Sequence, residues 1–70
     1  MSKIKTKENR LIELRIKKGL SMNEFAKQIK SNVGVISKIE NGMANPRPKT
    51  AQKICEALGV NFDEIFVIIS

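Results

Sequence analysis

The stretch that decides the fold runs from Met22 to Asn41 and reads MNEFAKQIKSNVGVISKIEN. Its apolar residues recur at intervals of three and four, which predicts two short helices separated by three residues. Ala26 is small enough for the second helix to cross closely over the first, while Ile36 and Ile39 fill the wedge between the two. The spacing therefore predicts a helix-turn-helix arrangement in which the outer face of the second helix is left free.

The same periodicity continues on both sides of this stretch and predicts five helices, at 7–18, 22–29, 33–41, 48–58 and 62–66. Ser21 and Glu24 have the spacing of a capping box, Gly19 can end the first helix, and Pro48 suits the first position of the fourth. Helices this short must pack on one another to be stable, and their short connections make neighbours cross. We expect one domain, residues 1–70, with an all-α fold: a compact five-helix orthogonal bundle.

Composition argues against catalysis and against membrane insertion. The chain has 70 residues, no His, no Tyr and a single cysteine, Cys55, so a disulfide framework, a Cys/His metal site and most acid–base machinery are missing. The longest apolar run is Ile65 to Ile69, and no apolar segment follows the first lysines. We therefore expect no enzyme, no catalytic residue, no metal and no cofactor, in a protein that stays in the cytoplasm.

Charge is distributed unevenly along the chain. Residues 1–53 carry all thirteen Lys and Arg against four acids, a net charge of +9, whereas residues 54–70 carry three acids and no base, a net charge of −3. Such a basic region attracts polyanions, with nucleic acid first and an anionic membrane surface second. Charge alone equally fits a protein that carries it for solubility.

The second helix of the motif has a face suited to DNA. An α-helix fits the major groove of B-DNA, and a face of small residues with one long cation permits close approach. The positions that point away from the predicted core are Val33, Gly34, Ser37, Lys38 and Asn41.

From Leu11 to Phe66 the chain resembles the phage-repressor and Cro-like helix-turn-helix domains of the Xre family. The resemblance is carried by Leu14-Arg15, Lys18-Gly19-Leu20-Ser21, Glu24-Phe25-Ala26, Ile36-Ser37-Lys38-Ile39-Glu40-Asn41-Gly42, Asn45-Pro46, Ala57-Leu58-Gly59-Val60 and Asp63-Glu64-Ile65-Phe66. It implies a lambda-repressor-like bundle that binds specific double-stranded DNA, with the third helix in the major groove and dimers on two-fold-related half-sites.

The resemblance also implies roles for particular residues. Lys38 is the best candidate for a hydrogen bond to guanine, and the positions that would face base edges are Val33, Gly34, Ser37 and Lys38. Phosphates would be held by amides and side chains of Met22, Asn23, Asn41, Asn45, Arg47 and Lys49.

Arg15 and Glu40 resemble a family ion pair that joins the first helix to the end of the third and positions the recognition helix. The chain departs from the family at Met22, where Gln is usual, and at Lys30, where the turn usually has Gly. A residue other than glycine is mildly strained at a positive φ, so we expect strain at Lys30 or a differently shaped turn.

Both ends of the chain leave two interpretations open. Val67, Ile68 and Ile69 are branched apolar residues that follow the last core position, and we expect them to form a two-fold dimer interface, as a small strand pair between subunits. The alternative is that this tail, residues 67–70, folds back on its own domain. The run Lys3, Lys5, Lys7 and Arg10 is either an arm that reaches DNA or a frayed, solvated terminus.

The resulting hypothesis is a transcriptional regulator, expected to be a repressor, that binds a palindromic operator as a homodimer. No sensor domain is expected, so control would come from protein concentration or from a second regulatory protein. One alternative is an antitoxin-like or accessory protein whose main role is to bind a partner polypeptide through its apolar tail. The other is a charge-driven binder of RNA or of an anionic membrane, although the resemblance favours DNA and no membrane partner.

Overall fold

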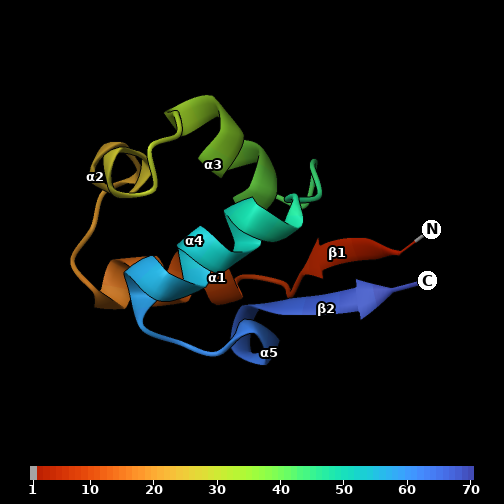
Figure 1. Cartoon of the computed structure of the whole chain (residues 1–70). Helices are drawn as coiled ribbons and strands as arrows, with labels where there is room; N and C mark the ends of the chain where they lie inside the picture. Colours follow the sequence, from red (N-terminus) through yellow and green to blue (C-terminus); the bar gives the residue numbers. More distant parts are fainter. Residues whose placement is uncertain (1) are drawn as a thin grey trace.

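A computed structural model describes residues 2–70 and has five helices and two strands in this range (Figure 1). In chain order the elements are β1 (Lys3–Thr6), α1 (Arg10–Lys17), α2 (Met22–Gln28), α3 (Val33–Glu40), α4 (Pro48–Leu58), α5 (Phe62–Ile65) and β2 (Phe66–Ile69). The helices cross one another around a shared interior, as expected, and the two strands extend from one end of the bundle with both chain termini. No helix among residues 2–70 has the length and apolarity needed to cross a membrane.

Capping hydrogen bonds start both helices of the central motif. The Glu24 amide donates to Ser21 Oγ at 3.1 Å, and the Ser21 amide donates to Glu24 Oε1 at 3.0 Å, which completes the predicted capping box. Hydrogen bonding of the Glu24 carboxyl to the backbone amide of Ser21, and to the Ser21 side chain, lowers the pKa of this exposed group. At the start of α3, the Val35 amide donates to Asn32 Oδ1 at 3.0 Å. Short-range chemistry therefore positions both helix starts.

The turn between α2 and α3 has the strained backbone expected at Lys30. Lys30 has φ +55°, in the left-handed region that favours glycine. Its amide donates to the Lys27 carbonyl at 3.2 Å, and the Ser31 amide donates to the Ala26 carbonyl at 2.8 Å. These are the two bonds of a Schellman motif, so the turn keeps the usual shape of a helix end and Lys30 bears the strain.

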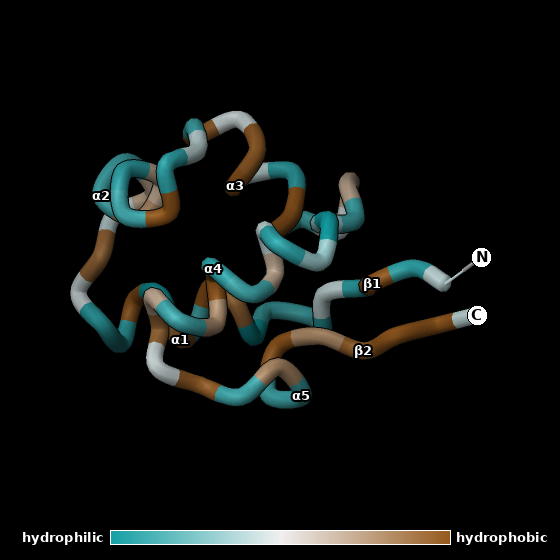
Figure 2. The backbone as a smooth tube through the Cα atoms, in the orientation of Figure 1, coloured by the Kyte–Doolittle hydropathy of each residue, from teal (hydrophilic) through white to brown (hydrophobic). Residues whose placement is uncertain are grey.

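The core lies where the five helices meet. Its apolar members are Leu11, Phe25, Ala26, Ile29, Ile36, Ile39, Ala51, Ile54, Cys55, Leu58, Ile65 and Phe66. The hydropathy-coloured backbone shows that each helix alternates hydrophobic and hydrophilic segments, as amphipathic helices around one interior do (Figure 2). Burial raises the pKa of the Cys55 thiol, and the Glu64 carboxylate adds to the effect, as expected of a cysteine that is part of the core.

The two strands correct the expectation of an all-α fold. β1 and β2 form an antiparallel pair in which Lys5 lies opposite Val67 and Ile4 opposite Ile68. The tail therefore folds back and pairs with the first residues of its own chain, and the lysines at 3 and 5 belong to neither a free arm nor a frayed end. Alternation of Lys and Ile in β1 and the β-branched run in β2 both favour extended structure.

The first helix is shorter than the predicted 7–18. It begins at Arg10 because Asn9, just before it, takes a left-handed conformation at φ +62° and so separates strand from helix. The other helices agree with the predicted ranges to within one residue. Lys7 lies in the connection, where its amide donates to the Ile65 carbonyl at 2.7 Å.

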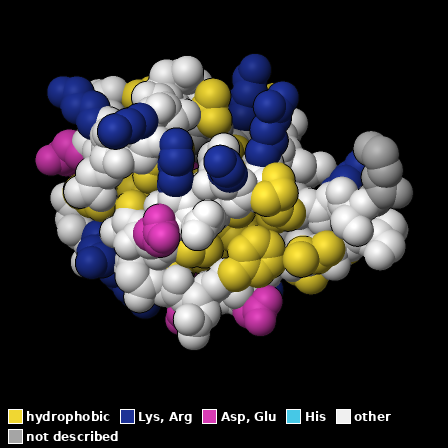
Figure 3. Space-filling model, viewed as in Figure 1, with side chains coloured by type: hydrophobic (Ala, Val, Ile, Leu, Met, Phe, Trp, Pro, Cys, Tyr) yellow, Lys and Arg dark blue, Asp and Glu magenta, His cyan; other side chains and the backbone are white. Residues whose placement is uncertain are grey.

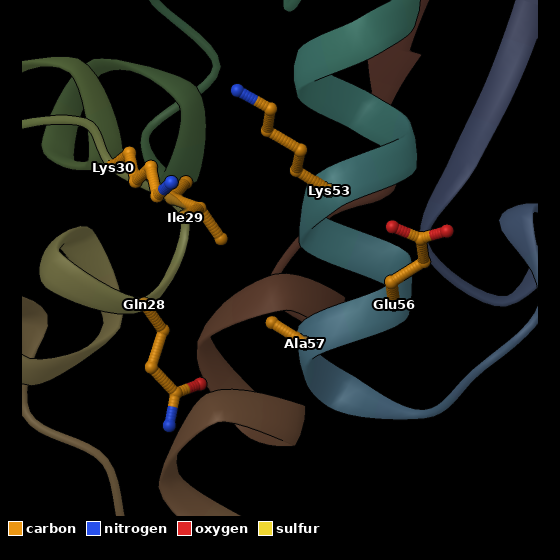
Figure 4. Close-up of a pocket in the computed structure, with 6 residues that line it drawn as sticks. All are labelled: Gln28, Ile29, Lys30, Lys53, Glu56 and Ala57. Atoms are coloured by element: carbon orange, nitrogen blue, oxygen red, sulfur yellow. The ribbon is translucent and has the colours of Figure 1, made fainter.

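Substitution Lys30→Gly is expected to stabilise the domain by about 0.5–1 kcal/mol, because glycine takes the left-handed conformation without strain. The Lys30 side chain lies over a hollow facing α4, and its ammonium does not point at the Glu56 carboxylate (Figure 4). The substitution therefore removes no ion pair among the described residues. Thermal unfolding should show a rise of several degrees in Tm.

The matched control is Lys27→Gly, which removes a lysine that is also exposed, from inside α2, and should lower stability by about 1 kcal/mol. A Tm that falls to the same extent in both variants would mean that the backbone at Lys30 is not strained.

Candidate nucleic-acid interface

The inner side of α3 is held firmly against the core. Ile36 is fully buried and Ile39 is 2% exposed, and both pack in the same cluster as Phe25, Ala26 and Ile29 of the preceding helix and its end. Buried apolar contacts of this kind determine which way the helix faces. The outer side of α3 is consequently presented to solvent in one orientation.

On that outer side, Gly34 and Lys38 are exposed and Ser37 is half-buried. The Asn41 amide group donates to Ser37 Oγ at 3.4 Å, so these two polar side chains lie one turn apart on the same face. Lys38 takes part in none of the ion pairs among residues 2–70. The predicted face therefore presents a small residue, a hydroxyl, a carboxamide and an unneutralised cation.

Two positions on α3 differ from the predicted face. Val33 is half-buried and packs against the core, so only part of its side chain could reach a base. Val35, which the helical periodicity assigned to neither face, is 37% exposed. A Cβ on Gly34 would lie 3.3 Å from Asn32 Oδ1, so the missing side chain leaves room for the carboxamide that caps the helix.

The residues predicted to meet phosphates lie at the two ends of the motif. Asn23 is exposed at the start of α2, and four more exposed residues lie at or after the end of α3: Asn41, Asn45, Arg47 and Lys49. Met22 differs from these residues, because its side chain is half-buried against the core. Only its backbone amide, at the start of α2, is then placed to meet a phosphate. Met43, 75% exposed in the connection to α4, was not predicted, since an exposed methionine has no local sequence signal.

A buried ion pair joins α1 to the end of α3. Arg15 Nε donates to Glu40 Oε2 at 2.6 Å and Arg15 Nη2 to Glu40 Oε1 at 3.4 Å, a two-pronged contact. Arg15 Nη1 also donates to the Leu20 carbonyl at 2.8 Å. The two side chains are only 10% and 5% exposed, so the pair that the sequence predicts is present and shielded from water.

On the face of the molecule drawn in Figure 3, most of the basic side chains lie on the side of the motif. In the space-filling view, Lys and Arg gather along the upper half of the molecule, where α2 and α3 lie, and hydrophobic side chains are exposed toward the strands (Figure 3). Among residues 2–70, no three His, Cys, Asp or Glu side chains come together in a way that could hold a metal ion. The exposed basic and polar side chains of this part of the molecule can donate hydrogen bonds and attract anions.

A family model described as helix-turn-helix matches residues 11–65, which is most of the chain. A search of curated protein sequences finds no match. The match excludes all of β1 and all of β2, so the two-stranded sheet lies outside the family's common core.

Solved structures with the same fold include gene regulators. The restriction-modification controller protein C.AhdI from Aeromonas hydrophila is 30% identical, with a TM-score of 0.75, over 80% of this chain and 85% of its own. The clp gene regulator ClgR from Corynebacterium glutamicum is 25% identical, with a TM-score of 0.74, over 80% of this chain and 60% of its own. A helix-turn-helix transcriptional regulator from Vibrio cholerae is 30% identical, with a TM-score of 0.71, over 80% of this chain and 32% of its own. The chain thus spans three fifths of ClgR and one third of the Vibrio protein.

Substitution Arg15→Ala is expected to destabilise the domain by about 3–5 kcal/mol, because it leaves the Glu40 carboxylate buried without a partner. Such a loss is comparable with the whole stability of a domain of this size, about 4–10 kcal/mol. Urea unfolding followed by circular dichroism measures it.

The matched control is Glu13→Ala, which breaks the exposed pair between Arg10 and Glu13 and should change stability by less than about 0.5 kcal/mol. The double variant Arg15→Met with Glu40→Leu should lose less than Arg15→Ala, since it leaves no buried charge unpaired. Equal midpoints for Arg15→Ala and Glu13→Ala would contradict the burial of the pair.

Proposed function

The chain belongs to the helix-turn-helix family of DNA-binding regulators, and from this premise we propose that it is a repressor that binds a palindromic operator as a homodimer. The observation that carries the proposal is the outer face of α3, where Gly34, Ser37 and Lys38 are accessible while the opposite side is locked into the core. An exposed helix held in one orientation is what entry into the major groove requires.

Base reading is assigned to the accessible part of α3. Lys38 would donate to O6 and N7 of guanine, and the hydroxyl of Ser37 would bond a neighbouring base edge. Gly34 lets the helix approach closely, and the accessible part of Val33 would contact a thymine methyl group. These contacts supply specificity, since a base edge carries sequence information that a phosphate does not.

Phosphate binding is assigned to the residues that flank the reading helix. The amides at the start of α2, from Met22 and Asn23, would hold one phosphate. Asn41 at the end of α3, Asn45 and Arg47 in the following connection, and Lys49 in the first turn of α4 would hold phosphates on the other side of the groove. Contacts on both sides would orient α3 in the groove.

The proposed dimer forms through β2. Val67, Ile68 and Ile69 are 41%, 60% and 43% exposed, and β2 has one strand neighbour within the chain, so its other edge is unpaired among the described residues. An exposed apolar edge strand is a surface that proteins normally cover. Pairing with β2 of a second copy around a two-fold axis would cover it and place two reading helices on one face, about 34 Å apart.

Repression follows from occupancy. A dimer that spans two half-sites excludes any other protein from that segment of duplex, and this effect requires no additional surface. The test of the whole proposal is selection of bound sequences from a random duplex pool, which should return an inverted repeat bound about 10³-fold or more tightly than random DNA. A pool that shows no enrichment would refute the proposal and favour an accessory protein whose tail grips another polypeptide.

Substitution Lys38→Ala should relax specificity at one base pair in each half-site and cost about 1–3 kcal/mol of binding free energy to the selected sequence. Binding to random duplex should change far less. Titrations of the selected duplex and of its single-base variants measure the effect.

The charge-matched control is Lys18→Ala, at the end of α1 and near Gly59 of the α4–α5 connection, away from α3 (Figure 1). It should leave base preference intact. If Lys38→Ala weakened binding to all DNA sequences equally, Lys38 would contact a phosphate instead of a base.

Substitution Ile68→Lys should convert the dimer into a monomer, because a charged side chain would be buried at the strand pair. Sedimentation over a range of concentrations measures this change. The control is Ile16→Lys, which adds the same charge at a side chain that is 61% exposed on α1, against 60% for Ile68. A dimer population unaffected by Ile68→Lys would place the interface elsewhere.

A further inference from the structure

The two-stranded sheet brings the beginning of the chain to the end of the reading helix. Residues 3–6 lie outside the segment that the family model matches. Lys5 is exposed and pairs with Val67 of β2, and Lys7, two residues further along the chain, donates through its amide to the Ile65 carbonyl. β1 is therefore held at a defined place instead of moving freely.

That place adjoins α3. Lys5, Thr6 and Val67 of the sheet line the same surface hollow as Asn41 and Gly42, the two residues that follow α3. Asn41 belongs to the proposed phosphate-binding set. Lys5 of β1 thus lies beside the end of the reading helix α3, although the two segments are more than thirty residues apart in sequence.

The charges around this hollow leave Lys5 available. Glu40 lines it too, but its carboxylate is held by Arg15. The Lys7 ammonium donates to the Asp63 carbonyl at 2.6 Å and is held toward α5. Glu8 is the other acid in the lining, and neither it nor Lys5 belongs to an ion pair among residues 2–70. The Lys5 ammonium is therefore the cation here that has no protein partner in the described chain.

We propose that Lys5 binds a backbone phosphate of duplex DNA next to the one held at Asn41, so that β1 extends the contact surface past the end of α3. This inference rests on the proposed function and adds to it a residue outside the family's common core. The two sugar-phosphate backbones of the DNA duplex border the major groove. A DNA phosphate therefore lies beyond each end of a protein helix that occupies the groove. The strand pairing orders Lys5 before DNA arrives, which lowers the entropy lost on binding compared with a free arm.

The test measures the salt dependence of binding with the full chain. Substitution Lys5→Gln keeps a polar side chain on the strand and removes the charge. Loss of one phosphate contact should reduce the slope of log K against log salt by about 0.9 and weaken binding about eightfold at 0.1 M salt, equally for the selected operator and for random duplex. Melting temperature should be unchanged, since Lys5 is exposed.

Three further variants distinguish the position of the charge from the total charge of the chain. Lys18→Gln removes the same charge at the far end of α1 and should leave the slope unchanged. The double variant Ser2→Lys with Lys5→Gln restores the net charge at the outer end of the strand, and should still show the loss of Lys5→Gln. Lys5→Arg should keep the wild-type slope.

The outcomes distinguish this inference from the function on which it rests. A slope unaltered by Lys5→Gln, or fully restored by the relocated lysine, would overturn the assignment of Lys5 while leaving DNA binding intact. Failure of the wild-type chain to bind any duplex would overturn both.

Discussion

The buried contact between Arg15 and Glu40 is the constraint on which the geometry of the motif depends. A carboxylate with its side chain only 5% exposed is tolerated because a guanidinium meets it at 2.6 Å. The same guanidinium donates to the Leu20 carbonyl in the connection from α1 to α2. One side chain therefore ties together the end of α1, the entry to α2 and the end of α3, and a rotation of α3 would leave a buried charge unpaired.

Around this pair, the apolar contacts and the capping bonds act on different features. Ile36 and Ile39 determine which side of α3 is buried. Asn32 determines where the helix begins. The Schellman bonds at Lys30 determine the direction in which the chain leaves α2, at the expense of backbone strain in a lysine. Together they present Lys38 to solvent in one orientation, which is what reading a base edge requires.

The expectations that were correct rest on local patterns. The helix at Pro48–Leu58 was predicted to the residue because proline starts it and Gly59 ends it in a left-handed conformation. Val33 was predicted to face outward and is half-buried, and the exposed Val35 was assigned to neither face. Helical periodicity assigns a residue to a face but does not measure how far the neighbouring helix covers it. The sheet was missed because each strand has only four residues and its partner lies more than sixty positions away.

Except for the start of α1, the sequence by itself determined the positions of the helices, their caps, the apolar stripes that form the core and the family to which the chain belongs. Each of these features depends on residues that are only a few positions apart. Tertiary structure alone decided that the tail pairs with the first residues of the chain, and that Lys5 comes to stand beside Asn41. Such juxtapositions depend on how the whole bundle closes. The packing of the helices brings the two strands side by side, and the residues of one strand carry no local pattern that indicates the position of the other.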